Sequence, residues 1–533
     1  MPREAEFEEE THILSPLTLR FKSISTTMST DSQVAPAPYE EKPKDEMVEE
    51  VAVKHEDHAT AILPESLWGM SEEERNALER KIVRKMDLIV LPIIMILYIL
   101  NYIDRQNLAV SKLQGIMDDL DLTTQQFATC VSVLFAGYLP FQIPSNYIIS
   151  RIPRPGLYIC CAVVCWGAIS AATAAVQSYS ALVGVRVVLG AVEAVFFPGV
   201  LYYLSAWYTK KELGKRYAGL FIGQQLGNGF GGLIAAGVLK LDGKHGIRGW
   251  RWLFIVEGVV TVGFGIIFAF VMPEFPHNAR VLKPIERDLA VWRLEQEAGA
   301  GEAHDDISTT RAYLSALKDP KVYMLIGCMM CSQAMGSVGN FFPTILQALG
   351  YDSLITLCLT APPYIFACFI FAGISWWSDR KQIMYWPIIV CLCIGIVIYI
   401  IAMTTLSVGA RYFAMMWTPV ANVVPQLFIY NTLSLHVARP YPKRAAGLAL
   451  INAIGGTSNI WGSYVWFAPP HFYAGFGMVL AVNVVFLCII TFYRFFVRRE
   501  NCRLDAGGEG ARAVMRRGVT EEQMSLGWRF VGY

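Results

Sequence analysis

The segment Arg186-Val-Val-Leu-Gly-Ala-Val-Glu-Ala-Val-Phe-Phe-Pro-Gly199 places an arginine and a glutamate inside an apolar run that extends from about residue 179 to residue 204. A run of this length is sufficient to cross a bilayer as an α-helix. Each ionisable group in such a helix costs roughly 2.5–3.5 kcal/mol on insertion scales. Arg186 and Glu193 fall about 20° apart on the same helix face. This polar stripe needs a protein-lined or water-filled surface, as a solute pathway through the membrane provides.

The composition indicates a membrane protein. The chain has 533 residues, of which 54% are hydrophobic and 17% are charged, too apolar for a soluble domain and too charged to lie wholly in lipid. The formal net charge of +1 leaves no basic surface for nucleic acid, so we expect no nucleic-acid partner. Most cysteines fall in apolar runs, which is typical of small buried side chains. Cys328 and Cys331 have zinc-like spacing but lack a second ligand pair, so we predict no metal and no cofactor.

Apolar stretches separated by short polar breaks recur from residue 86 onward and predict twelve transmembrane helices. The predicted spans are 86–108, 125–150, 156–176, 179–204, 216–239, 251–272, 321–347, 353–377, 384–404, 411–437, 444–468 and 472–496. The one long break, 273–320, carries charges of both signs and predicts solvated surface helices in a cytoplasmic loop. It separates a half at 81–272 from a half at 321–497, the arrangement expected of a duplicated transporter. The sequence therefore predicts an all-α polytopic membrane protein with two six-helix halves.

The tails and the loop charges predict the topology. Residues 1–80 are too polar to form a core and predict a disordered cytoplasmic tail without a cleavable leader. Residues 498–533 predict a second, short cytoplasmic tail. Lysine and arginine gather in the loops of one side, which the positive-inside rule places in the cytoplasm together with both termini. These loop residues are Arg151, Arg154, Lys210, Lys211, Lys215, Arg216, Arg380, Lys381, Arg439, Lys443 and Arg444. The basic loop at 240–251 lies on the other side and departs from the rule.

Four motifs carry a resemblance to a known family. The first span contains Asn101-Tyr-Ile-Asp-Arg-Gln-Asn107, and the fourth contains the segment 186–199. The second half contains Thr360-Ala-Pro-Pro-Tyr364 and Trp376-Trp-Ser-Asp-Arg-Lys381. Together they resemble the major facilitator superfamily, and within it the anion:cation symporter family. The resemblance extends over residues 70–500 and is closest to fungal permeases for allantoate and nicotinate. It implies the twelve-helix major facilitator fold.

One loop departs from the family pattern. The superfamily usually has a Gly…Asp-Arg pattern after its second helix, whereas this chain reads Ser145-Asn-Tyr-Ile-Ile-Ser-Arg151. Asp379 and Arg380 keep the second copy of the pattern. We therefore predict that Asp379 and Arg380 act as a gate or latch between helices, without a symmetric counterpart in the first half.

The first and fourth spans both combine an acid with an arginine. Asp104 and Arg105 are adjacent, so their side chains diverge by about 100° and one can face a cavity while the other packs on a neighbouring helix. Arginine offers a planar fork that suits a carboxylate. Protonation of Asp104 or Glu193 leaves arginine charge unbalanced and favours anion entry, which couples the proton to the anion. We predict Arg105 and Arg186 as anion-attracting groups and Asp104 and Glu193 as proton carriers, the roles that the resemblance implies for these positions.

Polar side chains in other spans are predicted to complete the substrate site. They are Tyr102, Tyr138, Gln224, Gln333, Asn340, Tyr430, Asn452 and Asn459. The alternative for each is a hydrogen bond between helices. Glu257 is expected to form a structural ion pair with Arg248 or Arg251.

The predicted activity is H⁺-coupled uptake of a small organic anion by alternating access, carried out by a monomer in the plasma membrane. Its partners are the anion, protons and the lipid bilayer. Three alternatives remain: an efflux antiporter of the same fold, a non-transporting nutrient sensor, and a membrane enzyme. Exporters commonly have a Gly-Pro motif in the fifth span, but residues 218–239 contain no proline. The C-terminal tail is short for a signalling domain, and the spans show no catalytic constellation.

Overall fold

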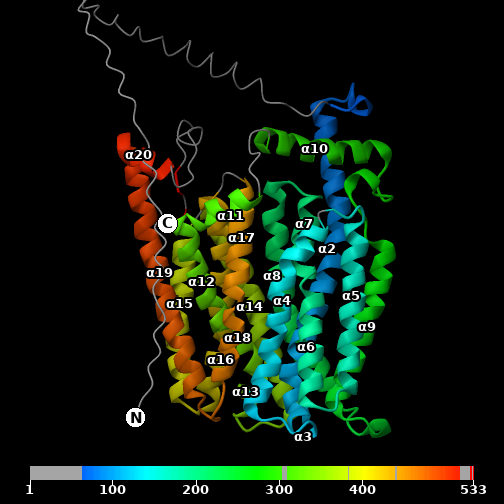
Figure 1. Cartoon of the computed structure of the whole chain (residues 1–533), viewed down its shortest axis with the longest axis vertical. Helices are drawn as coiled ribbons and strands as arrows, with labels where there is room; N and C mark the ends of the chain where they lie inside the picture. The colour runs from blue at the N-terminus through cyan, green and yellow to red at the C-terminus, as the bar shows by residue number, and fades with distance from the viewer. Residues whose placement is uncertain are drawn as a thin grey trace, which may run out of the picture. The chain divides into compact units, whose positions relative to one another are not determined.

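The long helices of the chain stand side by side, with α10 and α11 at one end of the bundle and α3 at the other (Figure 1). The computed structural model describes residues 63–149, 151–302, 309–381, 383–437, 441–515, 529–530 and 532, and these residues form helices and connections without a strand. All of them belong to one compact unit. Of the tail predicted for residues 1–80, residues 1–62 lie outside the described residues.

The first half contains the six predicted spans. Its long helices are α2 (Glu72–Ser111), α4 (Thr124–Ile149), α5 (Pro155–Ala172), α6 (Tyr179–Glu193) continued by α7 (Phe196–Ser205), α8 (Lys210–Leu239) and α9 (Gly249–Val271). Its short elements are η1 (Glu65–Leu67), η2 (Lys112–Gln114), α3 (Ile116–Asp119), η3 (Thr173–Ala175) and η4 (Lys244–Gly246). Between the halves lie η5 (Pro276–Asn278), α10 (Pro284–Glu302) and α11 (Thr309–Leu317).

The second half repeats the arrangement. Its helices are α12 (Pro320–Gly336) and α13 (Val338–Gln347), α14 (Ser353–Lys381), α15 (Tyr385–Thr404), α16 (Val408–His436), α17 (Tyr441–Gly456) followed by α18 (Ser458–Gly462) and η6 (Ser463–Val465), α19 (Tyr473–Ala506) and α20 (Gly508–Met515). Nine helical segments of the described chain are long and apolar enough to cross a membrane. The other three predicted spans coincide with α8, α16 and α17–η6, which carry many of the amide side chains described below.

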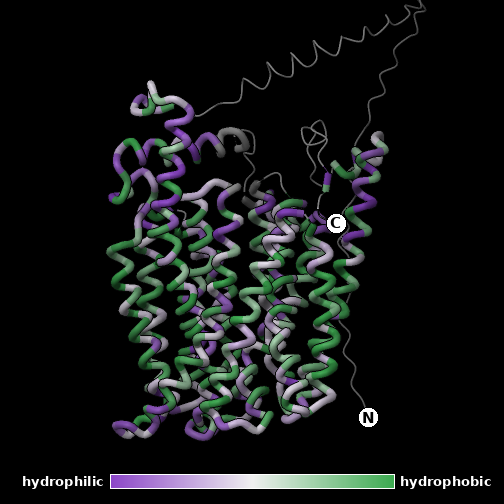
Figure 2. Tube along the Cα trace, turned by 180° about the vertical axis from the view of Figure 1, so that it is seen from behind, coloured by the Kyte–Doolittle hydropathy of each residue, from purple (hydrophilic) through white to green (hydrophobic). Residues whose placement is uncertain are grey.

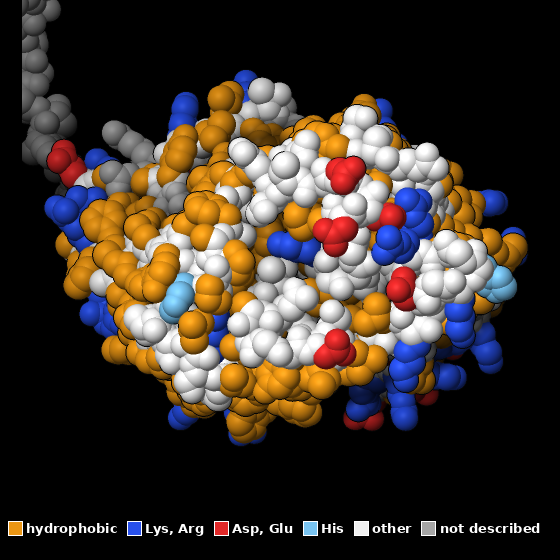
Figure 3. Space-filling model, turned by 90° about the horizontal axis from the view of Figure 1, so that it is seen from below, with side chains coloured by type: hydrophobic (Ala, Val, Ile, Leu, Met, Phe, Trp, Pro, Cys, Tyr) orange, Lys and Arg blue, Asp and Glu red, His pale blue; other side chains and the backbone are white. Residues whose placement is uncertain are grey.

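Hydropathy follows this architecture. Figure 2 shows mostly hydrophobic residues along the middle of the bundle and more hydrophilic ones toward both ends. Figure 3 views the end where α3 lies, and there charged side chains of both signs stand among neutral ones. A bilayer solvates the apolar middle and leaves the charged ends in water.

The first helix begins earlier than predicted. It starts at Glu72, because the Ser71 hydroxyl accepts from the Glu74 amide at 3.3 Å and the Glu74 carboxylate accepts from the Ser71 amide at 2.9 Å. This capping box satisfies two amides that a helix start otherwise leaves open. The prediction of disorder up to residue 80 is therefore wrong for residues 72–80. At the other end, α19 continues to Ala506, and the backbone of Phe530 pairs with the Asn501 side chain at 3.0 Å.

The central segment is helical, as predicted, but α10 is not fully solvated. Its Glu286 side chain is buried and accepts from the Lys283 amide at 3.0 Å and from Lys85 of α2 at 3.3 Å. Burial alone raises the pKa of Glu286, but these donors outweigh burial and hold the pKa below its usual value. Arg293 of α10 is also buried and pairs with Glu79 and Glu212 at 3.3 Å each. These ion pairs fix α10 across the end of the first half.

The two halves meet along α8 and α14 and again near α3. In that second region α13 contacts α2, while α18 and η6 contact α4. The Tyr464 hydroxyl donates to the Thr129 hydroxyl at 3.1 Å, and the Phe127 and Phe341 rings lie 6.4 Å apart edge to face. These contacts close the α3 end of the interface between the halves.

Candidate functional site

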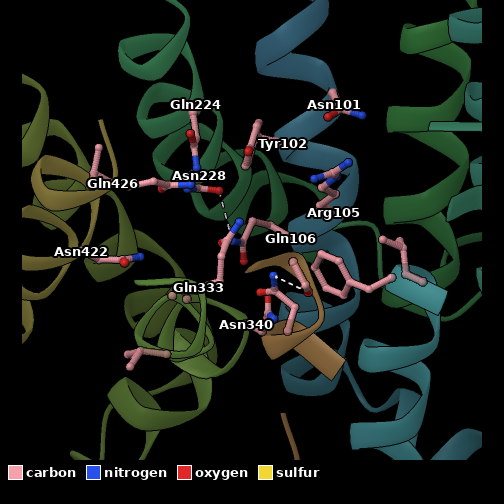
Figure 4. A pocket seen from close by; sticks show the side chains of 18 of the residues that line it. Asn101, Tyr102, Arg105, Gln106, Gln224, Asn228, Gln333, Asn340, Asn422 and Gln426 are labelled. Carbon is pink, nitrogen blue, oxygen red and sulfur yellow. Dashed lines mark hydrogen bonds between the residues drawn. The ribbon is translucent and has the colours of Figure 1, made fainter. Parts of the chain in front are cut away.

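A polar cavity of about 180 Å³ lies between the two halves. Both halves contribute side chains that point into a common space (Figure 4). All ten residues predicted to bind substrate line it: Tyr102, Arg105, Tyr138, Arg186, Gln224, Gln333, Asn340, Tyr430, Asn452 and Asn459. The described lining contains two arginines and no lysine, aspartate or glutamate.

Several cavity residues were not predicted. Seven of them are amides: Asn101, Gln106, Gln142, Gln225, Asn228, Asn422 and Gln426. The sequence could have predicted two of them, Asn422 and Gln426, because they recur with Tyr430 every four residues on one face of α16. Gln106 joins the first and fifth spans through a hydrogen bond to Asn228 at 3.1 Å. A surface of amides and phenols can adapt its donors and acceptors to a polar solute.

Arg105 is held by Glu193. The Arg105 Nε donates to Glu193 Oε2 at 2.7 Å, and the glutamate side chain is fully buried while the arginine keeps 18% of its side-chain surface exposed. The guanidinium lies 4.6 Å from the Tyr138 ring centroid and 5.5 Å from that of Tyr102. Glu193 Oε1 has no hydrogen-bond partner among the described residues. The glutamate therefore stands directly behind a cavity-wall arginine and competes with any anion for its charge.

Arg186 has donor capacity to spare. Its Nε donates to the Cys130 carbonyl at 3.3 Å, and the side chain is almost fully buried. Its Nη1 finds no partner within the described part of the chain. A desolvated guanidinium without an acceptor is costly, so this position in the cavity wall favours an anionic ligand.

Asp104 faces away from the cavity. It is buried and accepts from Trp166 Nε1 at 3.1 Å, Ser170 Oγ at 3.1 Å and Thr261 Oγ1 at 3.3 Å. These donors come from α5 and α9, which pack behind α2. The pair thus diverges as predicted: Arg105 lines the cavity, and Asp104 packs against the neighbouring helices.

Glu257 does not form the predicted ion pair. Arg251 and Arg248 pair instead with Asp119, at 3.3 Å and 3.6 Å. Asp119 lies on α3 at the bundle end, where it can reach both arginines near the start of α9. Glu257 remains buried within α9.

The predicted gate is described only in part. Arg380 is exposed at the end of α14 and stacks on the Trp376 ring at 4.6 Å from its centroid. The side chain of Asp379 lies outside the described residues. Its gating role stays a prediction.

Comparison with known proteins identifies the fold. The family profile of the Major Facilitator Superfamily matches residues 94–463. The chain belongs to the major facilitator superfamily. An uncharacterised transporter of Schizosaccharomyces pombe is 32% identical to it over 79% of this chain and 87% of its own length. The high-affinity nicotinic acid transporter of Saccharomyces cerevisiae is 28% identical over 80% of this chain and 79% of its own.

A solved structure shows the same fold. The bacterial homologue of the human lysosomal transporter Spinster, in an inward-facing and occupied conformation, aligns with a TM-score of 0.59 and 15% identity, over 81% of this chain and 98% of its own. This major facilitator protein is thus a multi-pass membrane transporter and not an enzyme. The predicted fold class is confirmed.

Proposed function

We propose that this major facilitator protein carries out H⁺-coupled uptake of a small organic anion. The observation that carries the proposal is the buried Arg186 in the cavity wall, whose Nη1 has no partner among the described residues. Beside it stands a second arginine, Arg105, whose only described ion-pair partner is Glu193. Arg186 has no ion-pair partner among the described residues, so it brings unbalanced positive charge to the cavity wall.

A carboxylate is the chemistry that fits this site. The planar guanidinium binds a carboxylate through two parallel hydrogen bonds, and the surrounding amides and tyrosines can bind the remaining polar groups. The relative from Saccharomyces cerevisiae is a nicotinic acid transporter, and nicotinic acid is a small aromatic carboxylate. This relative supports a carboxylate substrate for the present chain.

Proton coupling follows from the competition for Arg105. While Glu193 is ionised, it neutralises Arg105 and weakens the attraction for an anion. When Glu193 takes up a proton, Arg105 regains an unbalanced charge, so the proton and the anion favour each other's binding. Asp104, the other proposed proton carrier, acts from behind α2 and not from the cavity.

Alternating access of the two halves would move the bound anion. We propose that the end of the bundle with α10 is cytoplasmic, in agreement with the basic loops, and that both termini lie on that side. The contacts of Tyr464 and Phe341 would then close the outer side. We retain the plasma membrane and a monomer as parts of the proposal.

The test uses the purified full chain in liposomes. Labelled nicotinate and a panel of other small carboxylates are offered outside, with and without an outside-acid pH gradient. We expect at least one carboxylate to accumulate only with the gradient, and the uncharged analogue nicotinamide to be excluded. Equal uptake of nicotinamide and nicotinate, or accumulation indifferent to the gradient, would contradict the proposal. Accumulation driven only by an inside-acid gradient would favour the efflux alternative.

A further inference from the structure

A buried acid outside the cavity has no role in the mechanism above. Glu257 of α9 is 4% exposed, and no described residue donates a hydrogen bond to either of its carboxyl oxygens. An ionised carboxylate in this position would lack both water and donors, which is expensive inside a membrane protein.

Helix geometry places Glu257 beside Asp104. The helices α2 and α9 are in contact and run in opposite directions as the first and sixth spans. The Thr261 hydroxyl of α9 donates to Asp104 Oδ2 at 3.3 Å, which fixes their register. Glu257 lies one turn before Thr261, and Asn107 lies one turn after Asp104, so Glu257 faces Asn107 across the helix pair. The Asn107 amide in turn reaches Asp104 Oδ1 at 3.5 Å.

The hydrogen-bond donors around Asp104 and Glu257 are unequally divided between these two acids. Asp104 receives hydrogen bonds from the side chains of Trp166, Ser170 and Thr261, in addition to the long contact with Asn107. Such donors stabilise the ionised form of a carboxylate. Neither oxygen of Glu257 accepts a hydrogen bond of normal geometry from a described residue; the Asn107 amide lies near its carboxyl, and the negative charge of Asp104 faces it. The surrounding residues of α2, α5 and α9 therefore favour the neutral form of Glu257 over that of Asp104.

The cations on the surrounding elements are engaged elsewhere. Arg105 of α2 pairs with Glu193, and Arg251 of α9 pairs with Asp119. Lys112 of η2 lies over the ring of Phe127. The groups that α5 turns toward the two acids, Trp166 and Ser170, are uncharged. Within the described chain, Asp104 is thus the charged group that faces Glu257.

We propose that Glu257 is a proton-binding site of this transporter, in which the carboxyl of Glu257 holds one proton whenever Asp104 beside it is ionised. The proton comes from solvent water and returns to it, and no other bond is made or broken. Ionisation of Glu257 would set two negative charges against each other across α2 and α9. Asp104 and Arg105 are adjacent on α2, and Arg105 lines the cavity. A shift of α2 caused by this repulsion would therefore move Arg105 in the cavity wall. This coupling rests on the transport function proposed above, whereas the proton site does not.

The proton site is tested without any substrate. Infrared difference spectra of the purified full chain between acid and alkaline buffer report the C=O stretch of protonated carboxyl groups. We expect one component of the titrating carboxyl band to be lost in Glu257→Gln and retained in Asp104→Asn and in Glu193→Gln. A spectrum unchanged by Glu257→Gln, or the loss of that same component in Asp104→Asn, would overturn the assignment.

A second measurement needs no variant and so does not depend on folding of a mutant. Hydrophobic carbodiimides react with protonated carboxyls inside membrane proteins, and mass spectrometry locates the adduct. We expect labelling of Glu257 at acid pH that is lost at alkaline pH. An adduct on Asp104 in place of Glu257, or no adduct on either, would refute the proposal. Neither readout uses transport, so a chain that carries no organic anion would still reveal the site.

The coupling is tested separately in liposomes with a carboxylate from the panel above. Glu257→Gln should preserve exchange of labelled for unlabelled substrate at equal pH and lose accumulation driven by a pH gradient. Accumulation that Glu257→Gln leaves unchanged would show that the proton on Glu257 is not coupled to transport.

Discussion

At the scale of single residues, Arg186 divides its donors between the protein and the cavity. Its Nε is committed to the Cys130 carbonyl, and its Nη1 is free of described partners. The ammonium of lysine cannot reproduce this fork. Arg186→Lys should therefore lose about one charged hydrogen bond, 1.5–3 kcal/mol, which corresponds to a roughly 10- to 150-fold weaker Kd for the transported carboxylate. Binding to purified protein measures the change in Kd, with Arg311→Lys on the exposed face of α11 as the control. Equal affinity in both variants would remove Arg186 from the site.

Glu193 makes the second prediction at this scale. Glu193→Gln keeps the shape of the side chain but removes the charge that neutralises Arg105. Anion binding and exchange at equal pH should therefore persist, while accumulation driven by a pH gradient should be lost. Uptake into liposomes measures both, and Glu295→Gln on the exposed face of α10 is the matched control. Gradient-driven accumulation at wild-type level would show that Glu193 carries no proton.

At the scale of helices, much of the structure could be predicted from the sequence. Polar side chains are costly in lipid, so those in apolar spans must face protein or water, and this reasoning located the ten predicted cavity residues. The rotation of α2 could not be predicted in the same way. The adjacency of Asp104 and Arg105 says only that the two diverge. Which one faces the cavity is decided by Trp166 and Thr261, donors on helices distant in sequence. The pairing of Arg251 with Asp119 was missed for the same reason.

The contact between α8 and α14 supports a prediction about a helix pair. A Cβ added to Gly232 of α8 would collide with the Thr360 hydroxyl and lie 2.8 Å from the Leu357 carbonyl oxygen of α14. Gly237, five residues further along α8, has nothing within 4 Å of such a Cβ. Gly232→Ala should force the halves apart at a cost of about 1–3 kcal/mol, lowering the Tm and the transport rate, whereas Gly237→Ala should lower neither. Thermal unfolding in detergent tests this, and equal behaviour of the two variants would refute it.

At the scale of the whole molecule, alternating access requires that contacts at one end of the bundle break while others form. At the α3 end the Tyr464 hydroxyl bonds Thr129 of the other half at 3.1 Å. Tyr464→Phe removes that hydrogen bond, about 0.5–1.5 kcal/mol, and should shift the equilibrium roughly 2- to 12-fold toward states open at the α3 end.

Hydrogen–deuterium exchange measures this shift. We expect faster exchange in η6, α18 and the first turns of α4, with no change in α10, because the hydrogen bond closes only the α3 end. Tyr323→Phe is the matched control, since Tyr323 is exposed on the outer face of α12 and loses the same hydroxyl. If Tyr464→Phe and Tyr323→Phe exchange alike, the Tyr464–Thr129 bond does not hold the halves together. Faster exchange confined to the α3 end would instead identify it as one of the contacts that the transport cycle must break.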